Sequence, residues 1–310
     1  MINYLVTGGA GFIGSHLAEK LLKKGRVRVI DNFSTGKKEN IKGLDIELIE
    51  ADIRNPEKVK NACRGIDCIF HLAAIPSVTR SLKNPLPTNE VNVEGTLNLL
   101  IAAKENNVKR FVYSSSSSVY GENQKLPKKE SMSPDPISPY AVSKLAGEHY
   151  CRLFFKLYYL KVIILRYFNV FGERQDPKGE YAAAIPKFII SALNKKRSTV
   201  YGDGEQRRDF TYVENTVEAT IFASEAPEKA IGKTFNVASG KVRTVNEVLL
   251  YLNKILYQKI EPIYTKPRVG DIKDSWADIS QANNLLGYSP RIDFENGLRK
   301  TVDWFKEKEQ

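Results

Sequence analysis

The first 170 residues alternate short apolar runs with longer stretches in which apolar residues recur every three or four positions. The short runs are rich in Val, Ile, Leu and Phe and predict strands at residues 3–7, 27–31, 46–50, 68–71, 110–114 and 162–167. The longer stretches predict helices at residues 12–24, 56–63, 85–106 and 140–158. In the first of these helices, Ile13, Leu17 and Leu21 share one face.

Strands that alternate with helices favour parallel βαβ units joined by right-handed crossovers. The predicted strands are nearly continuous apolar runs, as expected of strands buried on both faces. We therefore expect an α/β fold, with a doubly wound parallel sheet in a main domain at residues 1–170. Shorter elements separated by loops rich in Gly, Pro and charge predict a smaller C-terminal α/β region at 171–310. Strands near 162–167 and 234–237 are still expected in the main sheet.

Composition limits the class of protein. The chain has 310 residues, of which 42% are hydrophobic and 27% charged, which is typical of a globular protein and excludes a collagen-like or disordered chain. The formal net charge of +11 raises the question of nucleic acid, but basic and acidic residues are interspersed along the whole chain. We therefore expect no nucleic-acid partner, because an anionic small substrate accounts for the charge as well.

Other features bear on compartment and metals. The most apolar stretch, 153–171, is interrupted by three basic residues, so no membrane span is expected, and the N-terminus lacks the pattern of a signal peptide. Three cysteines, Cys63, Cys68 and Cys151, form no C-x-x-C pair. This pattern predicts a reducing, cytoplasmic setting and no metal site.

The run T-G-G-A-G-F-I-G at residues 7–14 follows the first predicted strand and opens the first predicted helix. Gly9, Gly11 and Gly14 satisfy G-x-G-x-x-G, and Gly8, Gly11 and Gly14 satisfy G-x-x-G-x-x-G. Glycines allow a tight turn and the close approach of a pyrophosphate to the free N–H groups of the helix N-terminus. Alone the motif could be a structural turn, but its place between a strand and a helix indicates a dinucleotide site.

Two acidic residues refine the choice of dinucleotide. Asp31 ends the second predicted strand, 17 residues after Gly14, where a carboxylate accepts ribose hydroxyls and repels a 2′-phosphate. Asp52 follows the third strand, where it would either hold the adenine amino group or cap the next helix. The combination predicts NAD rather than NADP.

A candidate proton-transfer pair lies in Y-A-V-S-K at residues 140–144, at the start of a predicted helix. Tyr140 and Lys144 are four residues apart and share a face, so the ammonium would stabilise a tyrosinate. Free tyrosine has a pKa of about 10, so a base active near neutrality needs a shift of roughly 3 units, about 4 kcal/mol. Serines at 114–118 end the fifth strand, at the edge where ligands bind, and one could relay a substrate proton. The alternatives are a surface Tyr–Lys pair and a flexible serine loop.

Taken in order, the motifs show a resemblance to a known family. They are T-G-G-A-G-F-I-G (7–14), D-N (31–32), H-L-A-A (71–74), N-V-E-G-T (92–96), S-S-S-S-S-V-Y-G (114–121), P-Y-A-V-S-K (139–144) and R-Y-F-N-V-F-G (166–172). The chain resembles the extended short-chain dehydrogenase/reductase superfamily and, within it, the nucleotide-sugar 4-epimerases. This implies a UDP-sugar substrate, tightly held NAD, a transient 4-keto sugar, and a homodimer in which the helices at 85–106 and 140–158 form a four-helix bundle.

The resemblance also implies roles for individual residues. Ser116 and Tyr140 would be the proton-transfer partners, and Lys144 would contact the nicotinamide ribose. The cofactor-binding set would be Gly8, Gly11, Phe12, Ile13, Gly14, Asp31, Asn32, Phe33, Ser34, Thr35, Gly36, Asp52, Ile53, Leu72, Ala73, Ala74, Ile75, Asn92, Ser114, Tyr140, Lys144, Tyr167 and Phe168. The substrate-binding set would be Ser116, Tyr140, Asn169, Ala183, Ala184, Tyr201, Arg208, Arg268, Asp271 and Ser275.

The sugar is a finer question. The segment R-Q-D-P-K-G-E-Y-A-A-A-I-P at 174–186 is similar to the UDP-N-acetylglucosamine 4-epimerase subgroup. Ser275 stands where, in the family, a tyrosine confines the pocket to glucose and galactose, whereas a small residue admits a 2-acetamido group. An open pocket does not reject the smaller sugar, so we expect activity on both UDP-GlcNAc/UDP-GalNAc and UDP-Glc/UDP-Gal.

Two alternatives remain open. A UDP-glucuronate 4-epimerase is compatible with S-S-S-S-V-Y-G and with the positive charge. A non-catalytic NAD-binding scaffold or RNA-binding relative is disfavoured by the intact Ser116, Tyr140 and Lys144. A 4,6-dehydratase or a decarboxylase would carry acidic residues where this chain has Ser117 and Ser118.

Overall fold

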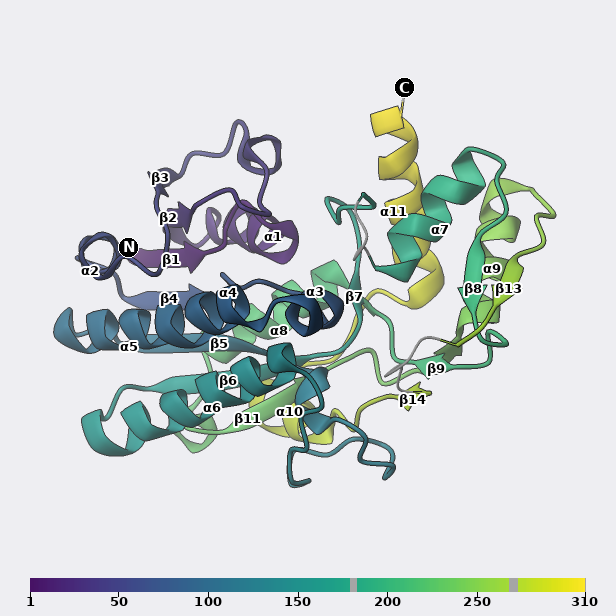
Figure 1. Cartoon of the computed structure of the whole chain (residues 1–310). Coiled ribbons are helices and arrows are strands. Elements are labelled where there is room, and N and C mark those ends of the chain that lie inside the picture. Colours follow the sequence, from purple (N-terminus) through teal and green to yellow (C-terminus); the bar gives the residue numbers. More distant parts are fainter. Residues whose placement is uncertain (179–182, 268–272, 310) are drawn as a thin grey trace.

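A seven-stranded parallel sheet forms the centre of the computed structural model, which describes residues 1–178, 183–267 and 273–309 (Figure 1). The strand order is β11-β6-β5-β4-β1-β2-β3, and every neighbouring pair is parallel. The strands are β1 (Ile2–Thr7), β2 (Gly25–Asp31), β3 (Glu47–Glu50), β4 (Cys68–His71), β5 (Arg110–Ser116), β6 (Val162–Tyr167) and β11 (Thr234–Val237). This confirms the predicted doubly wound α/β fold. The order reverses between β1 and β4, where such sheets bind ligands at their carboxyl ends.

Helices cover both faces of the sheet, as the apolar strands require. One face carries α1 (Phe12–Leu21), α8 (Val213–Ser224) and α10 (Ser280–Leu286), and the other carries α2 (Pro56–Ala62), α5 (Gly95–Glu105) and α6 (Pro139–Tyr158). Each face has its own apolar core. Helix α6 begins at Pro139 because the Ser138 hydroxyl accepts a hydrogen bond from the Ala141 N–H and proline suits the first helical position.

The helix predicted over 85–106 forms three consecutive pieces. These are α4 (Pro85–Asn89), a π-helical turn η2 (Glu90–Glu94) and α5. The wider turn coincides with Asn92, whose side chain bonds to Ile75 and Ser143 from other parts of the fold. Helix α3 (Val78–Lys83) precedes α4, and both pack on α6.

The second half of the chain supplies a smaller region beside the carboxyl ends of the sheet, at the right of Figure 1. Its helices are α7 (Ala184–Leu193), α9 (Val245–Leu256) and α11 (Phe294–Glu309). Its strands are β7 (Val170–Phe171), β8 (Thr199–Tyr201), β9 (Arg207–Arg208), β10 (Thr211–Tyr212), β12 (Arg243–Thr244), β13 (Ile263–Thr265) and β14 (Asp274–Ser275). One continuous apolar cluster includes Leu165 of the sheet and Phe188, Val248 and Leu298 of this region, so the two parts share a core. Among the described residues, no helix combines the length and apolar character needed to cross a bilayer.

Candidate active site

The glycine-rich turn between β1 and α1 is packed too tightly for any larger residue. Gly8 has φ +69°, and a Cβ there would lie 2.8 Å from the Ala73 backbone. A Cβ on Gly14 would lie 2.1 Å from the Gly8 carbonyl oxygen. Gly11 directly precedes α1 and offers no side-chain cap, so the first N–H groups of the helix remain available for a phosphate. Phe12 and Ile13 follow in the first turn and are half-buried.

The segment after β4 is fixed against this turn by buried hydroxyls. Thr7 Oγ1 accepts from the N–H groups of Leu72 (3.2 Å) and Ala73 (3.1 Å) and lies 2.8 Å from His71 Nδ1. His71 Nε2 lies 2.8 Å from Thr96 Oγ1, which donates to the Asn92 carbonyl oxygen. Burial lowers the pKa of His71 to about 3, so its ring is neutral and serves as a link between the two threonines. Leu72, Ala73, Ala74 and Ile75 are all half-buried here.

The two predicted acidic residues lie differently. Asp31 is buried and accepts from the N–H groups of Ala10 (2.9 Å) and Phe33 (2.8 Å); burial nevertheless raises its pKa. Asp52 accepts from Asn32 Nδ2 at 2.8 Å and pairs with Arg54, which lowers its pKa to about 2. Asp31 therefore faces the glycine-rich turn, whereas Asp52 is already held by a cation.

The other predicted cofactor residues near these strands fall into three groups. Ser34 and Thr35 are exposed, and a Cβ on Gly36 would lie 2.9 Å from Asp31 Oδ2. Ile53 is buried where Gly95 of α5 approaches it. Asn92 accepts from the Ile75 N–H at 2.8 Å and donates to Ser143 Oγ at 3.0 Å, so it ties the segment after β4 to helix α6.

The proposed proton-transfer residues come together at the carboxyl end of β5. The Tyr140 hydroxyl lies close to Ser116, and Ser116 Oγ accepts from Ser118 Oγ at 2.8 Å. Lys144 Nζ donates to the Ser114 carbonyl oxygen at 2.8 Å, and Ser114 Oγ donates to the His71 carbonyl oxygen. The structure thus brings Tyr140, Ser116, Lys144 and Ser114 together, and Ser118, a member of the predicted serine run without an assigned role, joins them through Ser116.

The groups around Tyr140 do not by themselves bring its pKa below the value of free tyrosine. Burial raises the pKa of Tyr140 above its usual value, and the hydrogen bond from Ser116 offsets only part of that rise. Burial lowers the pKa of Lys144 to about 8, so the ammonium persists at neutral pH. A further cation beside Tyr140 would be needed for the phenolate to form readily.

Two predicted cofactor residues have buried side chains. The Tyr167 hydroxyl lies 2.7 Å from Thr220 Oγ1 of α8, inside the main core. Phe168 packs against Tyr120, with ring centroids 6.1 Å apart. Their side chains therefore serve packing, and only their backbone is placed near the end of β6, opposite Ser116.

A cavity of about 660 Å³ opens beyond the carboxyl end of β6. Five predicted substrate residues line it: Asn169, Ala183, Ala184, Tyr201 and Arg208. Ser275 lies on β14, paired with Arg208 of β9, and is half-buried. Arg268 and Asp271 lie outside the described residues. The volume falls in the range of ligand pockets.

Six polar residues of the cavity lining were not among the predicted site residues: Gln175, Lys187, Ser191, Arg197, Thr199 and Gln206. Lys187 directly follows the I-P of the 174–186 segment, so its position next to a recognised motif could have identified it. Arg197 and Gln206 lie in irregular segments with no motif, and only the fold brings them to the cavity.

A glycine-rich turn, an acidic residue after β2 and a Tyr–Lys pair at the edge of a doubly wound sheet define a dinucleotide-dependent enzyme. Residues 4–238 match the NAD dependent epimerase/dehydratase family, and the chain belongs to that family. The family is NAD dependent, which confirms the cofactor predicted from the sequence.

Three similar proteins illustrate the range of the family. The chain is 39% identical to a putative UDP-glucose 4-epimerase of Methanocaldococcus jannaschii, over 97% of this chain and 98% of that protein. It is 43% identical, with a TM-score of 0.95 and 99% coverage of both chains, to UDP-N-acetylglucosamine 4-epimerase from Methanobrevibacter ruminantium in complex with UDP-N-acetylmuramic acid. It is 37% identical, with a TM-score of 0.93, to UDP-glucuronic acid 4-epimerase from Bacillus cereus in complex with UDP-glucuronic acid and NAD, covering 99% of this chain and 100% of that one. These relatives support the resemblance to UDP-sugar 4-epimerases.

Proposed function

We propose that the protein interconverts the C4 epimers of UDP-sugars, with UDP-GlcNAc/UDP-GalNAc and UDP-Glc/UDP-Gal as substrates. The observation that carries this proposal is the cluster of Tyr140, Ser116 and the buried Lys144 at the carboxyl end of β5, together with a cavity of about 660 Å³ beyond β6 that Arg208 lines. A reaction at a hydroxyl of a diphosphate-linked sugar requires a group that transfers the hydroxyl proton and a cavity that binds the diphosphate.

The residues present fit NAD. A Cβ on Gly8 or Gly14 would fill the turn, and the uncapped start of α1 suits the pyrophosphate. Asp31 would hold the adenosine ribose, and Lys144 the nicotinamide ribose. When bound, NAD supplies the site that accepts and returns a hydride and a positive ring that lowers the pKa of Tyr140.

The chain's own groups would then move the proton. Tyr140, as phenolate, would take the proton of the C4 hydroxyl through Ser116 and return it when the 4-keto sugar is reduced on its other face. Lys144 would keep the phenolate stable by its charge. Arg208 and the cavity would hold the UDP part while the sugar turns, so that binding energy rests on the part that does not react.

An assay of purified protein tests this proposal. The protein is incubated separately with UDP-GlcNAc, UDP-Glc and UDP-glucuronate, without added cofactor, and the products are separated by anion-exchange chromatography. We expect the 4-epimers of the first two sugars. No product from any of the three, even with NAD added, would contradict the proposed function.

Ser275 is proposed to set the size of the sugar pocket. Ser275→Tyr is expected to lower kcat/KM for UDP-GlcNAc by roughly 100-fold, because the ring would occupy the space of the acetamido group, while UDP-Glc activity changes little. Steady-state kinetics with both substrates measure this, with Ser275→Ala as the control that keeps the residue small. An equal loss on both sugars would refute the steric role.

A UDP-glucuronate 4-epimerase is the second candidate. Arg197 lines the cavity, and its guanidinium donates to the main-chain carbonyl oxygens of Glu261 and Pro262. These carbonyl groups are uncharged, so they do not neutralise the positive charge of Arg197. A positive lining suits a uronate carboxylate. The UDP-glucuronate arm of the assay separates the two candidates.

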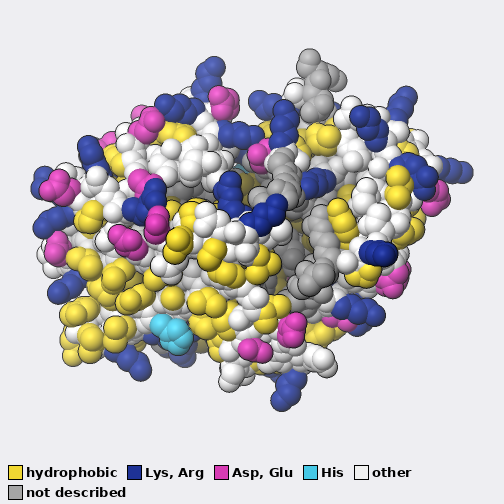
Figure 2. All heavy atoms as spheres, in the orientation of Figure 1, with side chains coloured by type: hydrophobic (Ala, Val, Ile, Leu, Met, Phe, Trp, Pro, Cys, Tyr) yellow, Lys and Arg dark blue, Asp and Glu magenta, His cyan; other side chains and the backbone are white. Residues whose placement is uncertain are grey.

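We propose that the protein is a homodimer through α5 and α6. Ile101, Val142, Leu153 and Leu157 on these helices are 41% to 56% exposed, and Figure 2 shows apolar side chains gathered over this part of the surface. The Leu153→Arg/Leu157→Arg double variant is expected to sediment as a monomer while the wild type sediments as a dimer. Leu250→Arg, at an exposed leucine of α9, is the matched control and should leave the dimer intact. A dimeric double variant would refute the interface.

The protein is also proposed to act in the cytoplasm. Its three cysteines are free and buried, and burial raises the pKa of the Cys63 thiol to about 12. Such unpaired thiols suit a reducing compartment.

A further inference from the structure

A buried ion pair joins α6 to β6 just behind the proposed catalytic edge. Arg166 Nε and Nη2 donate to the two carboxylate oxygens of Glu148 at 2.8 and 2.7 Å, and neither side chain is more than 1% exposed. Arg152 Nη2 adds a bond to Glu148 at 2.8 Å. Buried ion pairs are often no more stabilising than apolar residues of the same size, so stability alone is a weak reason for this one.

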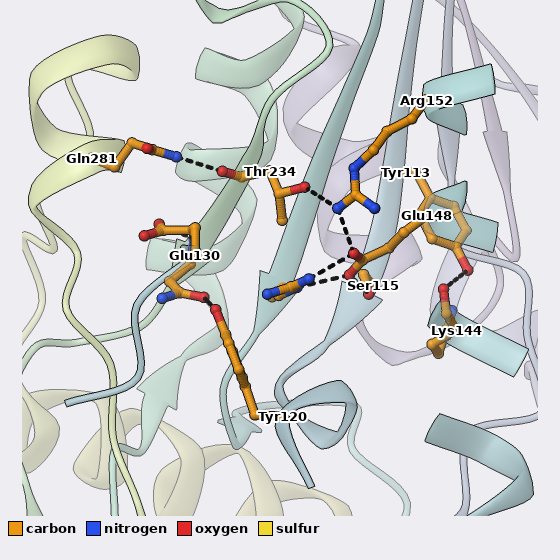
Figure 3. A network of polar contacts seen from close by, with 11 residues as sticks. Tyr113, Ser115, Tyr120, Glu130, Lys144, Glu148, Arg152, Thr234 and Gln281 are labelled. Atoms are coloured by element: carbon orange, nitrogen blue, oxygen red, sulfur yellow. Dashed lines mark hydrogen bonds and ion pairs between the residues drawn. The ribbon is translucent and has the colours of Figure 1, made fainter. Parts of the chain in front are cut away.

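Glu148 also reaches the strand that carries the proposed proton relay. Ser115 Oγ donates to Glu148 Oε1 at 2.6 Å, and Figure 3 shows Ser115, Glu148 and Arg152 converging at this point. Ser115 stands between Ser114, whose carbonyl oxygen accepts from Lys144, and Ser116, which lies beside the Tyr140 hydroxyl. A shift of Ser115 would therefore move both neighbouring contacts.

Further contacts between β5 and α6 lie next to the contact between Ser115 and Glu148. The Tyr113 hydroxyl donates to the Lys144 carbonyl oxygen at 3.3 Å (Figure 3), and a Cβ on Gly147 would lie 2.2 Å from that hydroxyl oxygen. Tyr140, Lys144 and Glu148 are spaced four residues apart and so share one face of α6. Hydrogen bonds thus join the strand to the helix at three successive residues of β5, Tyr113, Ser114 and Ser115.

We propose that Glu148, held by Arg166, is a positioning residue: through Ser115 it fixes the carboxyl end of β5 against α6, and so fixes Ser116 relative to Tyr140 and the Ser114 carbonyl relative to Lys144. This inference rests on the proposed function, because the groups being positioned are those of the proposed reaction. Glu148 is fully buried, and its proposed effect is on the alignment of the groups that carry out the reaction.

The test removes the hydroxyl of Ser115 and leaves the ion pair intact. Ser115→Val and Ser115→Thr have the same shape and differ only in the hydroxyl. We expect Ser115→Val to lower kcat roughly 10-fold, with KM for the UDP-sugar and the content of bound NAD unchanged, and Ser115→Thr to recover most of the loss. Thr301→Val is the control for loss of a buried hydroxyl far from the site, since Thr301 donates only to Gly297 within α11 at 2.7 Å.

The outcomes separate this inference from the proposed function. An active wild type with equal kcat in Ser115→Val and Ser115→Thr would overturn the positioning role and leave the proposed function standing. The same loss in Thr301→Val would also overturn it, because the effect would then be general destabilisation. A wild type inactive on every UDP-sugar would overturn the proposed function, and the positioning role with it.

Discussion

Replacing Tyr140 with phenylalanine is expected to lower kcat for epimerisation by about 10³-fold, because the substitution removes the only group proposed to take the C4 proton. The ring stays in place, so packing and the glycine-rich turn are unchanged. KM for the UDP-sugar and the amount of NAD that co-purifies should remain within about two-fold of wild type. The measurement is steady-state kinetics together with NAD release on denaturation.

Tyr159→Phe is the matched control, since Tyr159 lies at the end of the same helix and is 83% exposed. It should keep full activity. Unchanged turnover in Tyr140→Phe would remove Tyr140 from the mechanism. A loss of NAD together with activity would instead indicate a role in cofactor binding.

Replacing Lys144 with methionine is expected to lower kcat at neutral pH by roughly 100-fold, because the phenolate of Tyr140 loses the ammonium that stabilises it. The remaining activity should rise with pH beyond the optimum of the wild type, since a higher pH is then needed to ionise Tyr140. The pH profile of kcat measures this. A profile with the same shape as wild type would show that Lys144 does not act on the ionisation of Tyr140.

The same variant tests the pKa of Lys144 by a second route. In the folded NAD-free protein the pKa is about 8, below the usual 10.5, so between these values the unfolded chain binds more protons than the folded one. The free energy of unfolding of wild type should therefore rise relative to Lys144→Met from pH 8 to pH 10.5, by up to about 3 kcal/mol. Parallel curves for the two proteins in denaturant titrations would contradict the depressed pKa.

Local patterns in the sequence predict much of the fold and of the candidate site. Most of the strands are short apolar runs whose burial is visible in the sequence, although the edge strand β3 is largely exposed, and all seven of the central sheet occur where expected. The glycine-rich turn and the Tyr–Lys pair depend on neighbours within eight residues, so the sequence alone places them. The family match confirms the recognised family and its NAD dependence.

The rest depends on contacts between distant residues. The π-helical turn at 90–94 accompanies Asn92 bonding to Ile75 and Ser143, which no local pattern reveals. Arg166 interrupts an apolar strand, which was visible, but its partner Glu148 looks in sequence like an ordinary polar residue of a helix. Arg197 reaches the cavity only because α7 and β8 surround it.

The fate of the hydrogen on C4 of the sugar shows directly whether that carbon is transiently oxidised. UDP-GlcNAc carrying deuterium at C4 is incubated with the purified protein without added cofactor, and the product is examined by chromatography and mass spectrometry. Transient oxidation at C4 predicts UDP-GalNAc with the deuterium retained at C4, because the same hydrogen leaves and returns to the same carbon inside a closed site. UDP-GalNAc with the deuterium lost to water would contradict transient oxidation at C4.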